Sequence, residues 1–258
     1  IMQYGGGGAN HNPWDFTVYD ASAFTEETLA LFKRYATLHT RLFPLFWELA
    51  QASGTAGTPG ILPVGLAYPD ESFSSDTAFM IGSTLLVQPV EQAGVTTMDV
   101  ELPAGDWVHW WSGQRYAGGT VNVPAPVGEG PLFQRAGTAV PMLRRSIQTL
   151  SPSDGSVDSW ADDPGILSVR VVQDGTALEA MSLESGEQVA AAGGGLELSA
   201  GSRYTGWDLE IYTTGVSSVT MGGQAVAGGS EGCGSCWWQE GPWLRVELPA
   251  GSGTLSYQ

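Results

Sequence analysis

Few side chains in this sequence have both the chemical type and the spacing of a catalytic, redox or metal-binding site. Cys233 and Cys236 form one C-x-x-C pair in a turn-like, glycine-rich stretch. The pair is too small for a disulfide framework and lacks the second pair that a structural zinc site usually needs. A redox motif is disfavoured because no βαβ pattern surrounds it. We therefore expect a local, loop-pinning disulfide and, from it, an extracytoplasmic protein that is secreted, periplasmic or a lipoprotein.

Three carboxylates, Asp158, Asp162 and Asp163, lie close to Trp160. Calcium takes several oxygen ligands, so a calcium site is one interpretation of this group. The spacing does not match an EF-hand loop, which favours an exposed acidic turn and leaves calcium binding open. We assign no metal ligand and expect no cofactor.

Tryptophan side chains gather at two places in the sequence. Aromatic faces suit the apolar faces of pyranose rings, so each group could be a sugar-stacking platform. For the first group, Trp107, Trp110 and Trp111, structural packing is the favoured interpretation. For the second group, Trp237, Trp238 and Trp243, a small aromatic cluster is favoured. Glycan binding is the alternative for both groups.

The overall charge excludes several functions. The chain has 258 residues, with 10 Lys and Arg against 27 Asp and Glu, for a net charge of -17. Such a surface repels nucleic-acid backbones and anionic lipid headgroups. No run of about 18 apolar residues is present to span a membrane. With 42% hydrophobic residues, the chain can form the cores of one large or two to three small domains.

The first sixty residues predict a strand, a long loop and a helix. Ile1–Tyr4 is typical of the end of a buried strand, and four glycines then allow a turn. Thr25 is a plausible N-cap for an amphipathic helix, which Pro44 should kink or restart before its end near Ala52. His39 lies on the apolar face, so we expect a core histidine rather than a ligand.

Beyond residue 60 the apolar period changes to two. Short apolar runs alternate with turn signals every eight to twelve residues, which is typical of β-sandwiches and barrels. Pro103–Asp106 is predicted as one such turn, and the acidic stretch Ser151–Ser156 as a linker between two β-modules. A lone strand-loop-helix unit cannot bury itself, so we expect the chain to be a piece of a larger α/β assembly.

Three motifs and one helix carry a resemblance to a known family. In order along the chain they are Arg34–Leu45, Phe79–Val90, Leu102–Trp107 with Trp110–Gly113, and Gly130–Pro141. This succession resembles the C-terminal part of glycoside hydrolase family 31, the α-glucosidase and α-xylosidase family. The resemblance covers roughly residues 1–145, and the remainder fits loosely as the distal β-domain of such enzymes.

The resemblance implies a mainly β fold with two C-terminal β-sandwich domains, preceded by the last strand-loop-helix of a (β/α)8 barrel. It implies three domains: residues 1–57 as the incomplete end of the barrel, 58–150 as a proximal sandwich and 151–258 as a distal one. The family cleaves α-linked glucosides with retention, using two carboxylates about 5 Å apart. Both are Asp residues on earlier barrel strands, so we assign no catalytic residue in this chain and expect it to be inactive alone.

His11 is the one substrate-binding candidate that the resemblance supplies. Family members usually have a His in the loop after the last barrel strand that hydrogen-bonds a sugar hydroxyl, followed by Pro-Trp. Here His11 lies two residues before Pro13-Trp14, closer than in better-known members. A shifted loop could bring His11 to the same place, and a surface histidine is the alternative. Asn10, Asn12 and Asp15 could also reach hydroxyls, although solvated loop residues are the favoured interpretation.

These observations favour the C-terminal part of a retaining α-glycosidase. Its partners would be an oligosaccharide or glycoside substrate and the missing N-terminal catalytic barrel segment, with no nucleic acid and no membrane span. The alternative is a non-enzymatic carbohydrate-binding or cell-surface β-sandwich module. Such a module has no need of the strand, glycine loop and barrel-type helix in the first sixty residues.

Overall fold

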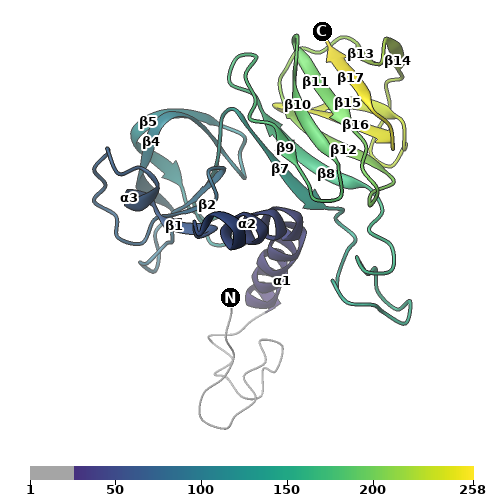
Figure 1. Cartoon of the computed structure of the whole chain (residues 1–258). Coiled ribbons are helices and arrows are strands. Elements are labelled where there is room, and N and C mark those ends of the chain that lie inside the picture. Colours follow the sequence, from purple (N-terminus) through teal and green to yellow (C-terminus); the bar gives the residue numbers. More distant parts are fainter. Residues whose placement is uncertain (1–25) are drawn as a thin grey trace.

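A computed structural model describes residues 26–258 (Figure 1). Two helices precede a short helix and seventeen strands in this part of the chain. The elements are α1 Glu26–Arg41, α2 Phe43–Ala56, β1 Ile61–Pro63, α3 Val64–Ala67, β2 Phe79–Ile81, β3 Leu85–Val87, β4 Thr97–His109, β5 Arg115–Pro124, β6 Leu132–Arg135, β7 Thr138–Leu143, β8 Leu167–Val172, β9 Met181–Ser182, β10 Gln188–Ala192, β11 Gly195–Ser199, β12 Gly206–Tyr212, β13 Val219–Met221, β14 Gln224–Val226, β15 Cys236–Glu240, β16 Trp243–Pro249 and β17 Gly253–Tyr257. No helix of residues 26–258 is long and apolar enough to cross a membrane.

The two long helices meet at Leu42, where the sequence predicts an interruption. Glu26 and Glu27 lie in the first turn of α1 and Arg41 in its last turn, each favourable to the helix dipole. Pro44 stands in the first turn of α2, where its missing N–H costs no hydrogen bond. Helix α2 continues past the predicted end and stops at Gly57, whose φ of 73° forms a left-handed cap.

The strands from β1 to β6 form one six-stranded antiparallel sheet in the order β1-β2-β3-β6-β4-β5. One apolar cluster contains residues from β2, β4, β5 and β6, including Met80, Val100, Trp107, Val123 and Phe133. The predicted proximal sandwich therefore takes the form of a single sheet that curls around its own core, with α3 beside it (Figure 1).

The predicted turn at Pro103–Asp106 is wrong, because these residues lie inside the 13-residue strand β4. Their pairing with β5 shifts register between Leu102 and Asp106, as at a β-bulge. Opposite the irregularity, a Cβ on Gly118 would lie 2.5 Å from the carbonyl oxygen of Pro103. The strand thus bends without ending, since glycine on its partner permits the close approach.

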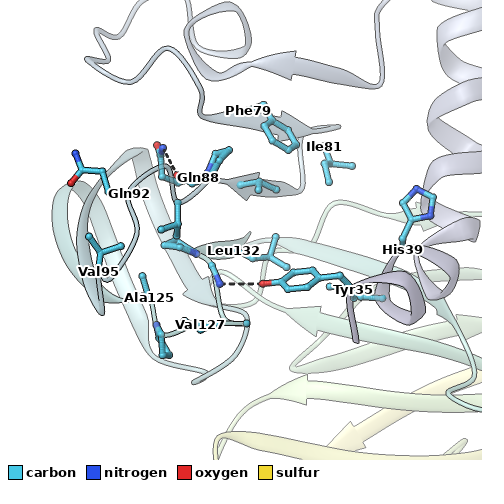
Figure 2. Close-up of a pocket in the computed structure, with 18 of the residues that line it drawn as sticks. Tyr35, His39, Phe79, Ile81, Gln88, Gln92, Val95, Ala125, Val127 and Leu132 are labelled. Atoms are coloured by element: carbon cyan, nitrogen blue, oxygen red, sulfur yellow. Dashed lines mark hydrogen bonds between the residues drawn. The ribbon is translucent and has the colours of Figure 1, made fainter. Parts of the chain in front are cut away.

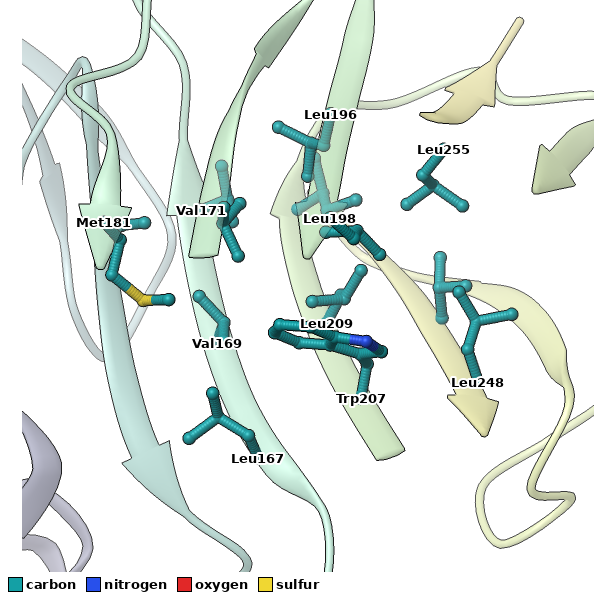
Figure 3. Packing of buried hydrophobic residues seen from close by; sticks show 14 of the residues in the cluster. Leu167, Val169, Val171, Met181, Leu196, Leu198, Trp207, Leu209, Leu248 and Leu255 are labelled. Carbon is teal, nitrogen blue, oxygen red and sulfur yellow. The ribbon is translucent and has the colours of Figure 1, made fainter. Parts of the chain in front are cut away.

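The remaining strands form a sandwich of two packed sheets. One sheet has the order β14-β13-β17-β11-β10-β9, and the other has the order β15-β16-β12-β8-β7 with β8 and β12 parallel. Figure 3 shows side chains from both sheets meeting in one core. Leu196, Leu198 and Leu255 of the first sheet share the cluster with Val169 and Leu209 of the second, all five without exposed surface. The predicted distal sandwich is therefore present.

Strand β7 joins the two β-units in an unexpected way. It follows β6 after only Ala136 and Gly137, yet it hydrogen-bonds β8 from Thr138↔Val172 to Leu143↔Leu167. The chain thus changes sheet ahead of the acidic Ser151–Ser156 stretch that the sequence marks as a linker. The domain limits at residues 57 and 150 stay predictions.

The predicted disulfide is present between Cys233 and Cys236, whose Cα atoms are 6.0 Å apart. Glu247 holds the same loop independently, since its carboxylate accepts the backbone N–H groups of Gly232 and Gly234, each at 2.8 Å. Cys236 is also anchored in the sheet as the first residue of β15. The loop is therefore fixed by more than the sulfur bridge.

We expect the double variant Cys233→Ser/Cys236→Ser to lose less than about 2 kcal/mol of unfolding free energy. The bridge closes a short loop, which gains the least chain entropy, and Glu247 continues to hold the loop. Urea unfolding of parent and variant measures the loss. Thiol titration of the unfolded, unreduced parent is the companion test, and finding two free thiols would refute the bridge.

Candidate functional site

An apolar groove of about 620 Å3 lies between α1, strands β2 and β3, and the loops around residues 88–95 and 125–131. Figure 2 shows Tyr35 and His39 of α1 on one side, with Phe79, Ile81 and Leu132 of the sheet across from them. No Asp or Glu lines this groove in the described part of the chain. The groove therefore suits an apolar protein surface better than acid-base chemistry on a sugar.

Helix α1 has no buried residue, although it carries the predicted apolar stripe. The prediction of a core histidine at position 39 is wrong for the described chain, because His39 is exposed and touches Phe46 with ring centroids 5.2 Å apart. Near the C-terminal end of the helix, Leu38 joins an apolar cluster together with Leu42, which follows the helix. The stripe residues Leu29, Phe32 and Ala36 are half-buried.

Polar contacts fix α1 against the loop that borders the groove. The Tyr35 hydroxyl accepts the backbone N–H of Gly130 at 3.1 Å, and Arg34 pairs with Glu129 at 3.1 Å. The Arg34 guanidinium also lies 4.2 Å from the ring centre of Trp111. These contacts attach α1 to the loop that borders the groove.

The Trp107, Trp110 and Trp111 group is structural. Trp107 is fully buried and donates its indole N–H to Pro103, and Trp110 is 6% exposed. Trp111 donates to the carbonyl of Gly130 at 2.9 Å and meets Tyr35 edge-on. The three rings belong to different contacts and form no common face, so the sugar-platform alternative does not hold here.

The second tryptophan group also has packing partners. Trp237 donates its indole N–H to Val226 at 3.1 Å, and Trp243 meets Tyr212 edge-on at 5.2 Å. Trp238 is half-buried near Arg245. The aromatic cluster predicted for this region is therefore split between the strands of the five-stranded sheet.

The acidic group near Trp160 already has partners. Asp158 and Asp163 pair with Arg144 at 3.7 and 3.3 Å, and Asp162 accepts the backbone N–H of Ser153 at 2.7 Å. Among residues 26–258, no cluster of three His, Cys, Asp or Glu side chains is arranged to hold a metal. These contacts support the acidic-turn interpretation.

The remaining sequence candidates, His11 with Asn10, Asn12 and Asp15, lie outside the described residues. Their proposed contact with sugar stays a prediction.

A charge network that the sequence analysis missed crosses three neighbouring strands. Glu210 of β12 stands in register with Arg170 of β8 and Arg245 of β16. It accepts Arg170 Nε at 2.7 Å, pairs closely with Arg245 and is reached by Arg145 at 3.3 Å. Asp208, two residues earlier on the same face, pairs with Arg245 at 3.1 Å. The strands thus align opposite charges across the sheet.

The network ties the two β-units together. Arg170 donates to the carbonyl of Trp110 at 3.0 Å and lies 4.0 Å from the centre of its ring. On its other side Arg170 lies 4.4 Å from the centre of the Trp243 ring. Arg170 therefore joins the hairpin of the proximal sheet to the distal sheet, which excludes water from Glu210 and leaves it 2% exposed.

Burial and charge act in opposite directions on these carboxylates. Burial would raise the pKa of Glu210, but Arg170 and Arg245 outweigh it and lower that pKa to about 2. For Asp208 burial prevails over the opposing charge of Arg245, so its pKa is raised. Glu210 is therefore the carboxylate whose ionised form the fold stabilises.

We expect the free energy of unfolding to fall as the pH drops from about 4.5 toward about 2. In the unfolded chain Glu210 has its ordinary pKa of 4.5, whereas in the folded chain its pKa is about 2. This pKa difference contributes about 3 kcal/mol to the free energy of unfolding. The contribution is fully present above pH 4.5 and is lost below about pH 2.

Urea unfolding of the parent and of Glu210→Gln at steps across this pH range measures the difference. The variant has no proton to bind at position 210, so its curve should be shallower, while Asp208 contributes to both proteins. Equal pH slopes for the two proteins would contradict the assignment.

Parts of this sequence are similar to known proteins. Residues 57–140 match the glycosyl hydrolase family 31 C-terminal domain. The chain is 32% identical over 142 residues to the sulfoquinovosidase of Escherichia coli, covering 54% of this chain and 20% of that protein. It is 32% identical over 170 residues to mouse neutral alpha-glucosidase C, covering 63% and 18%. The chain thus spans about a fifth of the curated relatives it matches.

A similar fold occurs in solved structures. The Flavobacterium johnsoniae GH31 dextranase complexed with glucose superposes with a TM-score of 0.76 at 18% identity. The match covers 98% of this chain and 34% of the dextranase. At this identity the likeness extends to the fold.

Proposed function

We propose that the chain is the C-terminal part of a retaining α-glycosidase of glycoside hydrolase family 31, which hydrolyses α-linked glucosides or related oligosaccharides. The match of residues 57–140 to the C-terminal domain of that family supports this assignment. The two carboxylates that retaining hydrolysis needs would come from an N-terminal barrel segment outside this chain. Relatives named as alpha-glucosidase and sulfoquinovosidase support an α-glycoside substrate.

The observation that carries the proposal is the apolar stripe of α1, a helix that borders the groove and has no fully buried residue. A helix with this stripe, held at a fixed angle to a β-domain, fits the last helix of a (β/α)8 barrel whose other elements would cover it. The β-units would then brace the barrel. A free-standing carbohydrate-binding module, the alternative, offers no reason for this helix.

The disulfide supports an extracytoplasmic location, because such bonds persist in oxidising compartments. We propose a secreted, periplasmic or lipoprotein enzyme on this ground.

The test of the proposed function uses the complete polypeptide that contains these residues. Its purified form should release sugar from aryl α-glucosides, aryl α-xylosides or an aryl α-sulfoquinovoside. Proton NMR in the first minutes should show the α-anomer before mutarotation, as retention requires. Activity confined to β-glycosides, initial release of the β-anomer, or sugar binding without turnover on the whole panel would contradict the proposal.

His11 would contact a sugar hydroxyl in this enzyme. We expect His11→Ala in the complete polypeptide to lower kcat/KM roughly ten- to a hundredfold, since a charge-assisted hydrogen bond is worth about 1.5–3 kcal/mol. Unchanged kcat/KM would exclude the contact, and a parallel fall in melting temperature would indicate loop packing instead.

A further inference from the structure

A small pocket of about 110 Å3 lies where the first turns of α2 meet the distal sandwich. Trp47 and Glu48 come from α2, Glu184 follows β9, Arg203 precedes β12, and Trp160 lies between β7 and β8. Four separate segments of sequence thus converge on one site, which is distinct from the apolar groove.

Aromatic rings form the base of this pocket. Phe43 stands between the two tryptophans, with ring centroids 5.9 Å from Trp47 and 4.8 Å from Trp160. Trp47 is 46% exposed, so part of a large aromatic ring is open to solvent. Its indole N–H donates to Glu184 at 2.8 Å, so the ring is held in one orientation with surface open to solvent.

Polar groups with unused hydrogen-bonding capacity border the aromatic base. Glu48 accepts the backbone N–H of Glu184 at 2.8 Å, and no hydrogen bond in residues 26–258 engages the second oxygen of either carboxylate. The Arg203 guanidinium lies 3.7 Å from the ring centre of Trp160 and pairs with no carboxylate of the described chain. The pocket therefore offers both acceptors and donors beside an open ring.

We infer that this pocket binds one pyranose unit of an oligosaccharide as a non-catalytic sugar site. The apolar face of a pyranose would stack on Trp47, and its hydroxyls, which both donate and accept, would meet Glu48, Glu184 and Arg203. The volume equals that of about four liquid waters, which limits the pocket to a single ring or part of one.

Charge argues for a neutral ligand. Two carboxylates face one guanidinium in a chain of net charge -17, which disfavours an anion. A cationic ligand is disfavoured because Arg203 already occupies the cation position over Trp160. That the sugar is an α-glucoside rests on the proposed function, whereas binding of a neutral pyranose does not.

Indole NMR of the complete polypeptide labelled with 15N-tryptophan tests the site directly. Maltose, added at a low temperature where its hydrolysis is slow compared with the titration, should shift the Trp47 and Trp160 indole signals saturably and leave that of Trp238 unmoved. Glucuronate, its charged counterpart, should bind more weakly. In Trp47→Ala, the maltose affinity reported by Trp160 should fall roughly tenfold, since the stacking face is lost. Trp238→Ala is the matched control with a half-buried ring elsewhere.

The outcomes separate this site from the catalytic function. Hydrolysis of an aryl α-glucoside should stay within about twofold in Trp47→Ala, and a parent without hydrolysis but with the maltose shifts would overturn the proposed function alone. Trp47 and Trp160 signals that do not move with maltose, or an affinity unchanged in Trp47→Ala, would overturn the sugar site. Arg203→Ala provides a second variant, for which we expect weaker maltose binding with an unaltered melting temperature.

Discussion

The 258-residue chain alone is expected to release no aryl alcohol from aryl α-glucosides or aryl α-xylosides above a heat-denatured control. Retaining hydrolysis needs a nucleophile and a general acid about 5 Å apart, and the groove beside α1 has no carboxylate in its described lining. Enzymes of this kind accelerate their reactions by many orders of magnitude, so removal of both groups leaves no measurable rate.

Activity should appear when the chain is joined to, or mixed with, the preceding segment of the complete polypeptide. A mixture that associates without turnover would contradict the expectation, as would turnover by the isolated chain. The matched control is a mixture containing Leu38→Asp, which places a charge on the apolar side of α1 beside the groove. This variant should weaken association and recovered activity together.

Glu210→Ala should lower the free energy of unfolding by about 3–5 kcal/mol. Arg170 and Arg245 would remain buried around an empty position, and their desolvation would no longer be offset by the opposite charge. For a chain of this size the melting temperature should fall by roughly 10 °C or more.

Glu129→Ala is the matched control for this variant. Its carboxylate also pairs with an arginine, Arg34, but both side chains are more than one-third exposed. Exposed pairs contribute less than about 1 kcal/mol, so the melting temperature should change little. A fall in Glu210→Ala no larger than in Glu129→Ala would refute the structural role of the network.

The sequence predicted those structural features that depend on residues close together in the chain. The apolar period of two beyond residue 60 predicted the β-rich part of the chain, and Pro44 marks the restart of the helix as expected. The Cys233–Cys236 bond follows from two cysteines separated by a glycine and a serine. In each case the deciding contacts lie within a few residues.

Features decided by distant partners could not be predicted this way. Pro103–Asp106 has the residue composition of a turn, but its pairing with the strand around Gly118 keeps β4 continuous. Ser168 and Arg170 alternate with apolar residues as on a solvent face, and only the approach of Trp110 from the other sheet buries Arg170. The site candidate His11 depended on a family resemblance, because a single loop histidine carries no signal of its own.

The passage of the chain from β6 to β7 through Ala136 and Gly137 limits how such enzymes can exchange their parts during evolution. The family match ends at residue 140, inside β7, so recombination there would split a strand between two genes. A crossover at the acidic stretch would instead transplant a distal sandwich whose β8 edge has lost its neighbour, with exposed backbone groups that invite aggregation. Gene fusions that keep residues 138–258 together should therefore yield soluble chimeras, and those that begin at residue 151 should not.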